Sequence, residues 1–195
     1  RTKSMLLTFL ANISQFIATI IFGCLALIAF LTLKFDFNYG LLVTGSGIVL
    51  LVGVFVYYRP RLLDFTPINR FYPQKIKEGI AFIQETNWLV KNKVLLLAFV
   101  RYFVFVTQYV LVLFAFGVQQ SIVLLYIAVG LIYLIMTILP SITFGKLFVR
   151  EASALMVLTA LSVPNAVILL SGFVIWMINI AFPALLGGSL LIAKK

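Results

Sequence analysis

The apolar residues of this chain are gathered into runs of about twenty, and this spacing limits the fold more than any other feature. Hydrophobic residues make up 64% of the 195 positions and charged residues 10%, where a soluble domain carries roughly a quarter. A bilayer core about 30 Å thick is crossed by about 20 helical residues. The sequence therefore predicts an all-α, polytopic helical membrane protein with five to six hydrophobic segments. The five clearest runs are Phe16–Leu33, Leu41–Tyr58, Val94–Phe116, Ile122–Leu139 and Ala166–Ala193.

The composition also excludes several kinds of site. Histidine is absent, which removes His-dependent catalytic triads, and the single cysteine, Cys24, cannot form an intrachain disulfide or a cysteine metal cluster. We expect no enzyme activity, metal or cofactor. The chain has room for a single membrane domain over residues 1–195, and because it begins with Arg1 we expect it to be a fragment of a larger membrane domain or a chain renumbered after truncation.

The formal charge of +10 comes from basic residues that flank the apolar runs. This placement is typical of loops held on the cytoplasmic side, and it favours anionic lipid over nucleic acid as a partner. Basic connections alternate with neutral ones along the chain. We therefore expect a multi-pass protein of the cytoplasmic membrane with its N- and C-termini, the connection over 59–93 and the stretch 146–150 in the cytoplasm.

The long connection over 59–93 combines two kinds of sequence. Prolines interrupt its first half, whereas Ile76, Ile80 and Ile83 would share one face of a helix in its second half. That pattern predicts a short helix lying in the cytoplasmic membrane interface. A solvated loop with chance spacing is the alternative.

Polar residues form stripes within the predicted helices. In lipid such side chains need a partner or water, so a stripe indicates either interhelical hydrogen bonding or the wall of a hydrated cavity. Arg101 could extend to the interface or contact a lipid phosphate, and Gln108 lies two turns along the same face. The stripe of the first helix is Ser4, Thr8, Asn12, Gln15, Thr19 and Gly23, and that of the last helix includes Gly172, Trp176, Asn179, Pro183 and Gly187.

The stretch from 140 to 165 does not read as an ordinary span. Pro140 and Pro164 bracket it, residues 141–151 are too polar to cross as a helix, and Ala152–Leu161 is only half a membrane long. This pattern predicts a broken or re-entrant element, in which Arg150 and Glu151 would pair. An ordinary cytoplasmic loop is the alternative. Further structural breaks are expected at Gly145, Pro183, Gly187 and Gly188.

The residues Gly145-Lys146-Leu147-Phe148-Val149-Arg150-Glu151-Ala152 resemble the Gly-Gly-x-Gly-Val-Arg-Glu-Ala motif of the lysylphosphatidylglycerol synthase transmembrane family, also called the flippase-like domain family. Lys146 and Phe148 replace two motif glycines. Pro183–Gly188 is similar to the Pro-x-x-x-Gly-Gly ending of the family, and the region of Arg101 and Gln108 resembles its preceding helix. The resemblance covers about the C-terminal half of the family's membrane domain and does not include a synthase domain.

The resemblance implies a bacterial inner-membrane protein that handles polar lipids. The expected function is a lipid flippase or translocase acting on anionic or modified phospholipid headgroups, with membrane phospholipids and a further membrane protein or a second copy as partners. A scaffold or assembly subunit is the alternative, and a headgroup-modifying enzyme is a weaker one. The expected headgroup-binding residues are Arg101, Gln108, Lys146, Arg150, Glu151, Asn12, Gln15 and Asn179.

Overall fold

The computed structural model describes residues 2–34, 40–59, 74–139 and 145–193, and within these ranges the protein is helical with no strand. The all-helical prediction is therefore confirmed. Three helices are long and apolar enough to cross a membrane, over Ser4–Leu33, Trp88–Ala115 and Asn165–Ser189, and Gly45–Phe55 and Ile122–Ile138 are shorter apolar helical segments. The chain divides into two compact units, unit 1 (Arg1–Phe103) and unit 2 (Val104–Lys195).

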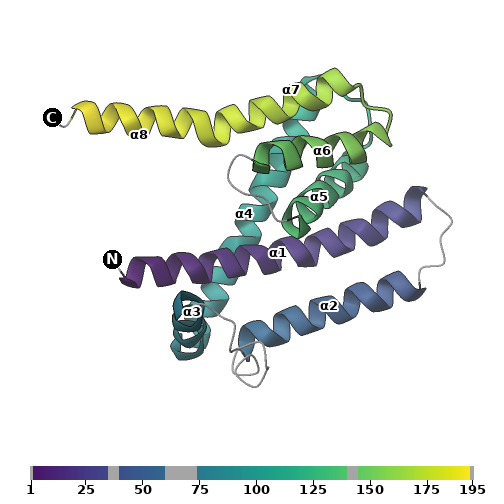
Figure 1. Cartoon of the computed structure of the whole chain (residues 1–195). Coiled ribbons are helices and arrows are strands. Elements are labelled where there is room, and N and C mark those ends of the chain that lie inside the picture. The colour runs from purple at the N-terminus through teal and green to yellow at the C-terminus, as the bar shows by residue number, and fades with distance from the viewer. Residues whose placement is uncertain (1, 35–39, 60–73, 140–144, 194–195) are drawn as a thin grey trace. The chain divides into compact units, whose positions relative to one another are not determined.

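Unit 1 is built around an antiparallel pair of helices, α1 (Thr2–Lys34) and α2 (Gly40–Tyr58), which lie side by side (Figure 1). Their shared core includes Leu10, Ile17 and Tyr57. The Tyr57 hydroxyl lies 2.9 Å from the Ser14 hydroxyl and donates a 3.2 Å hydrogen bond to the Lys91 carbonyl. One tyrosine thus joins α1, α2 and the start of α4 (Trp88–Ala115) through polar contacts inside an apolar core.

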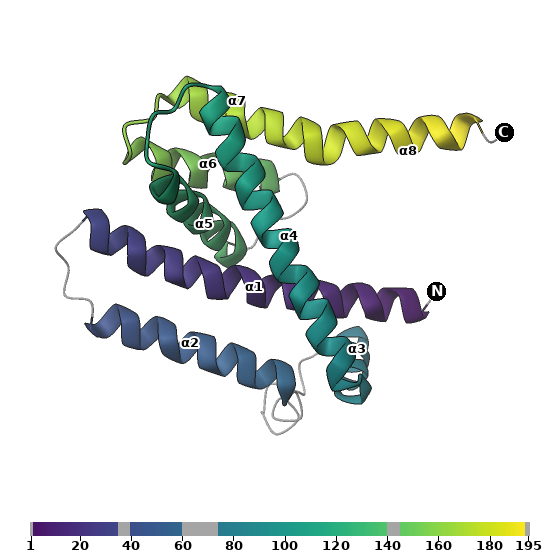
Figure 2. The same cartoon turned by 180° about the vertical axis from the view of Figure 1, so that it is seen from behind.

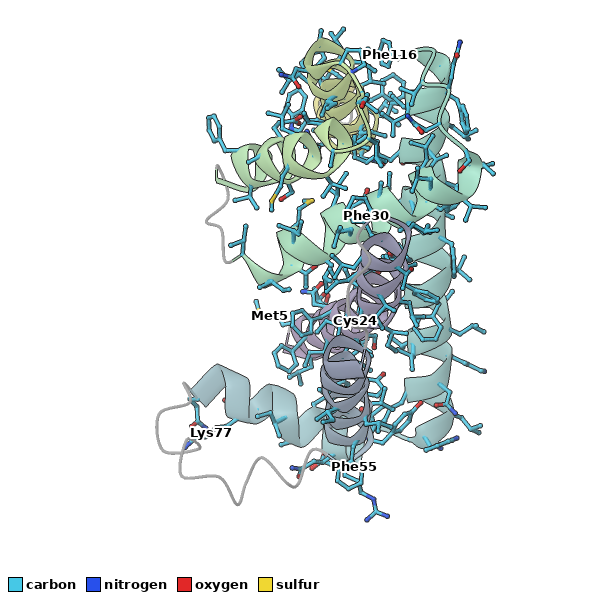
Figure 3. All side chains as sticks on the ribbon, turned by 90° about the vertical axis from the view of Figure 1, so that its right-hand side faces the viewer. Met5, Cys24, Phe30, Phe55, Lys77 and Phe116 are labelled. Carbon is cyan, nitrogen blue, oxygen red and sulfur yellow. The ribbon has the colours of Figure 1, made fainter. Side chains whose placement is uncertain are left out.

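The second half of the long connection forms α3 (Gln74–Glu85). Ile80 and Ile83 are buried, and the backbone at Gly79 lies so close to the Phe9 ring that a Cβ atom there would overlap it. Lys77 is exposed on the outer side of the helix (Figure 3). The apolar face of α3 therefore packs on α1. The Asn87 side chain accepts the Leu89 amide at 3.0 Å, which caps the next helix, α4.

Unit 2 holds the second half of α4 and the helices that follow it. These are α5 (Ile122–Ile138), α6 (Gly145–Thr159), α7 (Asn165–Trp176), the π-helix η3 (Met177–Ala181) and α8 (Phe182–Ala193). Helix α6 packs against both α5 and α7. The core contains Leu113, Leu125, Ile132, Leu158 and Ile168, all fully buried.

The helix α6 starts earlier than the sequence predicts. Residues 145–151 are helical and belong to the same helix as the apolar residues that follow, whereas the sequence predicts the half-length helix only from Ala152, and Pro140 lies outside the described residues. Lys, Arg, Glu and Ala are good helix formers, and the charges of Arg150 and Glu151 meet each other. At about 1.5 Å per residue, the 15-residue helix is about 22 Å long, less than the hydrocarbon thickness.

The chain stays helical through Pro183, Gly187 and Gly188, and an irregularity lies directly before Pro183, where a structural break is expected. Helices α7, η3 and α8 follow one another without interruption (Figure 2). Proline has no N–H for the carbonyl four residues earlier, and its ring collides with that carbonyl. The backbone responds by widening into a π-helix directly before Pro183, where the Phe182 amide donates to the Met177 carbonyl.

Candidate functional site

The Arg150–Glu151 ion pair is the centre of the candidate site. The Arg150 Nη2 and Nε atoms lie 2.6 Å and 3.2 Å from the same carboxylate oxygen, Oε1 of Glu151. The two side chains are only 11% and 23% exposed. Consecutive residues on a helix point in different directions. Both long side chains therefore bend toward each other, as expected where the low polarity of the surroundings makes an unpaired charge costly.

The second oxygen of Glu151 has no protein partner. Oε2 is buried and makes no hydrogen bond within the described part of the chain. The same is true of the hydroxyl of Tyr109 on α4, a residue that is fully buried. The Tyr109 hydroxyl interacts electrostatically with both Glu151 and Arg150. Two unsatisfied polar groups are therefore held near one ion pair, and each would gain from a hydrogen-bonding ligand.

Two further helices close around the pair. Gly172 on α7 lies against the Glu151 carboxylate, and a Cβ atom at this position would overlap it. Tyr133 on α5 interacts electrostatically with Arg150 and Tyr109. The cluster thus draws on α4, α5, α6 and α7, and we call Tyr109, Tyr133, Arg150, Glu151 and Gly172 the buried polar cluster.

A polar contact lies further along the same helices. The Asn179 side chain donates a 3.1 Å hydrogen bond to Oε1 of Gln108. Gln108 directly precedes Tyr109, and Asn179 follows Gly172 by about two turns. Two residues predicted as headgroup ligands are therefore in contact. Asn179 lies in the π-helix η3, and such bulges are frequent at functional sites.

The polar residues predicted on α1 lie in unit 1. Asn12 is exposed, and Gln15 is partly buried with its Oε1 atom unpartnered among the described residues. The Thr19 hydroxyl donates to the Gln15 carbonyl at 2.9 Å, and that of Thr8 donates to the Ser4 carbonyl at 2.9 Å. Both hydroxyls therefore find their hydrogen-bond acceptors in the backbone of their own helix. Arg101, on the unit 1 part of α4, is exposed.

The remaining predicted positions are at helix ends or outside the described residues. Gly145 is the first residue of α6, and the side chain of Lys146 lies outside the described part. Pro164 directly precedes α7 in extended backbone. Before it, Ser162 adopts a left-handed conformation with φ of 61°, and the Val163 amide bonds to the Leu158 carbonyl at 3.2 Å. This turn ends α6 and allows α7 to fold back on it.

A cavity of about 280 Å³ lies between this turn and the turn that follows α4. Its lining includes Gln119, Ser162 and Pro164. The Gln120 side chain donates to the Leu161 carbonyl at 2.8 Å, which joins the two turns. None of the residues that line it belongs to the buried polar cluster, so this cavity is separate from the cluster.

The sequence reasoning missed three members of the cluster as site residues. Tyr109 and Tyr133 lie within apolar helix sequence, and Gly172 was placed on the stripe of the last helix without a role in the site. Two features of the sequence could have pointed to these residues. Gly172 lies on the same stripe of the last helix as Asn179, and Tyr109 is adjacent to Gln108. Within the described ranges, no three His, Cys, Asp or Glu side chains gather in a way that could hold a metal ion.

Comparisons of the chain with protein-family models, with curated proteins and with solved structures found no match.

Proposed function

We propose that this chain is a lipid flippase-like protein that carries anionic or modified phospholipid headgroups across a bacterial cytoplasmic membrane. The observation that carries this proposal is the Arg150–Glu151 pair, held within helical unit 2 beside the unpartnered Glu151 Oε2 and Tyr109 hydroxyl. A soluble protein has no need for such a cluster beside long, exposed apolar helices, whereas a headgroup that crosses lipid needs polar contacts inside it.

Arginine is the side chain best suited to a phosphate group. Its guanidinium has five N–H donors in a planar fork, and two of the hydrogen bonds of Arg150 go to Glu151 Oε1. A phosphodiester can accept two donors from the same fork. Gln108 and Asn179 would contact the polar parts of the headgroup, while the acyl chains stay in the surrounding lipid.

The proposed membrane topology has five crossing segments or more. Helix α2 and helix α5 cross in addition to the three long apolar helices, and α6 forms a re-entrant element that does not reach both faces. The length of α6, about 22 Å, supports this arrangement. The basic residues near the chain ends and in 59–93 support a cytoplasmic location for these segments. Membership of the lysylphosphatidylglycerol synthase transmembrane family is part of the same proposal and rests on the motif around Arg150.

A reconstituted translocation assay tests the function. The protein is placed in liposomes that contain fluorescent phosphatidylglycerol, and headgroup movement is followed by quenching the outer leaflet. We expect movement in the unaltered protein and at least a tenfold loss in R150A and E151A, since losing one charge-assisted contact costs about 1.5–3 kcal/mol. The matched controls are K77A and E78A, an adjacent exposed pair of opposite charge on α3.

The possible results separate the proposals. Unchanged movement in R150A and E151A would remove the site assignment. No movement in the unaltered, correctly folded protein would remove the translocase function and favour the scaffold alternative. A loss of movement in K77A and E78A as large as in the site variants would mean that the assay reports general charge effects.

A further inference from the structure

The described side chains of the buried polar cluster carry one positive and one negative charge. Arg150 carries the positive charge and Glu151 the negative one, and their side chains are in contact at 2.6 Å. Among the described residues of the neighbouring helices, the Tyr109 hydroxyl on α4 interacts electrostatically with both members of the pair, and the Tyr133 hydroxyl on α5 interacts with Arg150. On α7 the facing residue is Gly172, which has no side chain.

An arriving phosphate therefore meets an arginine that already has an anionic partner. If the phosphate replaced Glu151 on the guanidinium, the cluster would hold two negative charges and one positive charge. Charges in a medium of low polarity repel strongly, and an uncompensated carboxylate is costly there. Protonation of the displaced carboxylate would restore neutrality, because the pair of charges would then be Arg150 and the phosphate.

The Tyr109 hydroxyl is the described group that a protonated Glu151 carboxyl would use as a hydrogen-bond partner. Glu151 Oε2 and the Tyr109 hydroxyl are both buried and without hydrogen-bond partners among the described residues, and they interact electrostatically. A protonated carboxyl can donate one hydrogen bond and still accept another, and a tyrosine hydroxyl can do both. The space in front of Gly172 is already filled by the carboxylate, so the side chain has little freedom on that side.

We propose that binding of an anionic headgroup to Arg150 is coupled to the uptake of one proton by Glu151, and that Tyr109 holds the protonated carboxyl. This proposal deepens the proposed function and rests on it. The proton comes from water and bonds to a Glu151 carboxylate oxygen, the ion pair with Arg150 is replaced by an ion pair with the phosphate, and release of the headgroup reverses both steps. Headgroup movement would thereby depend on the proton gradient.

Calorimetry measures this coupling directly. The purified full chain in detergent is titrated with short-chain phosphatidylglycerol at one pH in two buffers of different ionisation enthalpy, and the difference in observed heat gives the number of protons taken up. We expect about one proton per lipid bound, and an affinity that rises about tenfold for each pH unit lowered wherever Glu151 is ionised in the lipid-free protein.

Two variants separate the roles of the two side chains. E151Q, which keeps the shape of the carboxyl but cannot titrate, should bind lipid with about zero proton uptake. Y109F should still take up about one proton but bind several-fold more weakly, because the neutral carboxyl loses its partner. Circular dichroism and size-exclusion chromatography check that each variant is folded. Should E151Q not fold, the proton number of the unaltered protein and the affinity of Y109F test the same proposal.

The outcomes distinguish this inference from the function on which it rests. Lipid binding without proton uptake, or the same uptake in E151Q, would overturn the coupling and leave the headgroup site standing. Unchanged affinity in Y109F would overturn the role of Tyr109. No binding of phosphatidylglycerol at all would overturn both proposals. A parallel titration with glycerophosphoglycerol, the same headgroup without acyl chains, shows whether the site takes the free phosphodiester as well as the lipid.

Discussion

Gly172 on α7 lies directly against the carboxylate of Glu151 on α6. Because glycine has no side chain, it provides the space that the carboxylate occupies in its ion pair with Arg150. The two residues are far apart in sequence and belong to two helices that pack together. The contact explains a glycine in the interior of an apolar helix, where it is otherwise unfavourable by about 1 kcal/mol relative to alanine.

The substitution G172A should therefore destabilise the protein although alanine is the better helix former. The added methyl group must displace the Glu151 carboxylate, and overpacking of this kind costs about 1–3 kcal/mol. Thermal unfolding in detergent measures the effect. The matched control is G187A on α8, where a Cβ atom would meet nothing within 4 Å and stability should stay the same or rise.

A double substitution sharpens this test. If the carboxylate is the obstacle, G172A should cost little in a background of E151A, because the shorter side chain leaves room for the methyl group. Additive effects of the two substitutions would show that Gly172 is required for another reason.

The unpartnered hydroxyl of Tyr109 should lower the stability of the lipid-free protein. A buried polar group without a hydrogen bond costs about 1–3 kcal/mol, so Y109F should raise the free energy of unfolding. Y126F is the control, because the Tyr126 hydroxyl lies 2.8 Å from that of Thr107 and its loss should cost about 0.5–1.5 kcal/mol. Chemical unfolding in mixed micelles compares the two. A loss of stability in Y109F would indicate that water satisfies this hydroxyl.

The contact between Gln108 and Asn179 should contribute a measurable coupling energy. A cycle of Q108M, N179L and the double variant isolates the interaction, and hydrogen bonds between membrane helices contribute about 0.6 kcal/mol on average and up to about 1.7. The control cycle combines N179L with Q120M, because the Gln120 side chain donates to the Leu161 carbonyl and not to Asn179. Coupling in the control cycle of the same size would show that the substitutions act through general changes in packing.

The turns after α4 and α6 should respond in opposite directions to a reciprocal exchange. Each places one residue in the left-handed region, Gly117 with φ of 80° and Ser162 with φ of 61°. Since a side chain costs about 1–2 kcal/mol in this conformation, G117S should lower stability and S162G should raise it by up to about 1 kcal/mol. Thermal unfolding measures both. A decrease in S162G would mean that the serine hydroxyl contributes more than the backbone strain removes.

Local sequence patterns were sufficient to predict part of this architecture. The long apolar runs predicted helices, and helices over Ser4–Leu33, Trp88–Ala115 and Asn165–Ser189 have the length and composition to cross a membrane. The pairing of Arg150 with Glu151 was also predicted, from the cost of an isolated charge in apolar surroundings. The helices and the ion pair both depend on residues that are close together in the chain, and such residues can be compared directly in the sequence.

Predictions that depended on how a helix tolerates an unfavourable residue were less successful. A structural break was expected at Pro183, and the α-helical hydrogen bonding does change to a π-helix directly before it, but the chain stays helical. The half-length helix was expected to start at Ala152, but α6 starts at Gly145, and Arg150 and Glu151 pair within it. Residue preferences alone do not show which of these local adjustments the surrounding contacts allow.

The helical character of the protein and the lengths of its apolar helices follow from the order of residues along the chain, because hydrogen bonding within a helix and the hydrophobicity of a run are local properties. The surroundings of Glu151 do not follow from that order. Gly172 meets it because α7 packs on α6, and the Tyr109 and Tyr133 hydroxyls act on the ion pair from two other helices, so whether a hydroxyl or a glycine lies near a charge depends on how side chains distant in sequence pack.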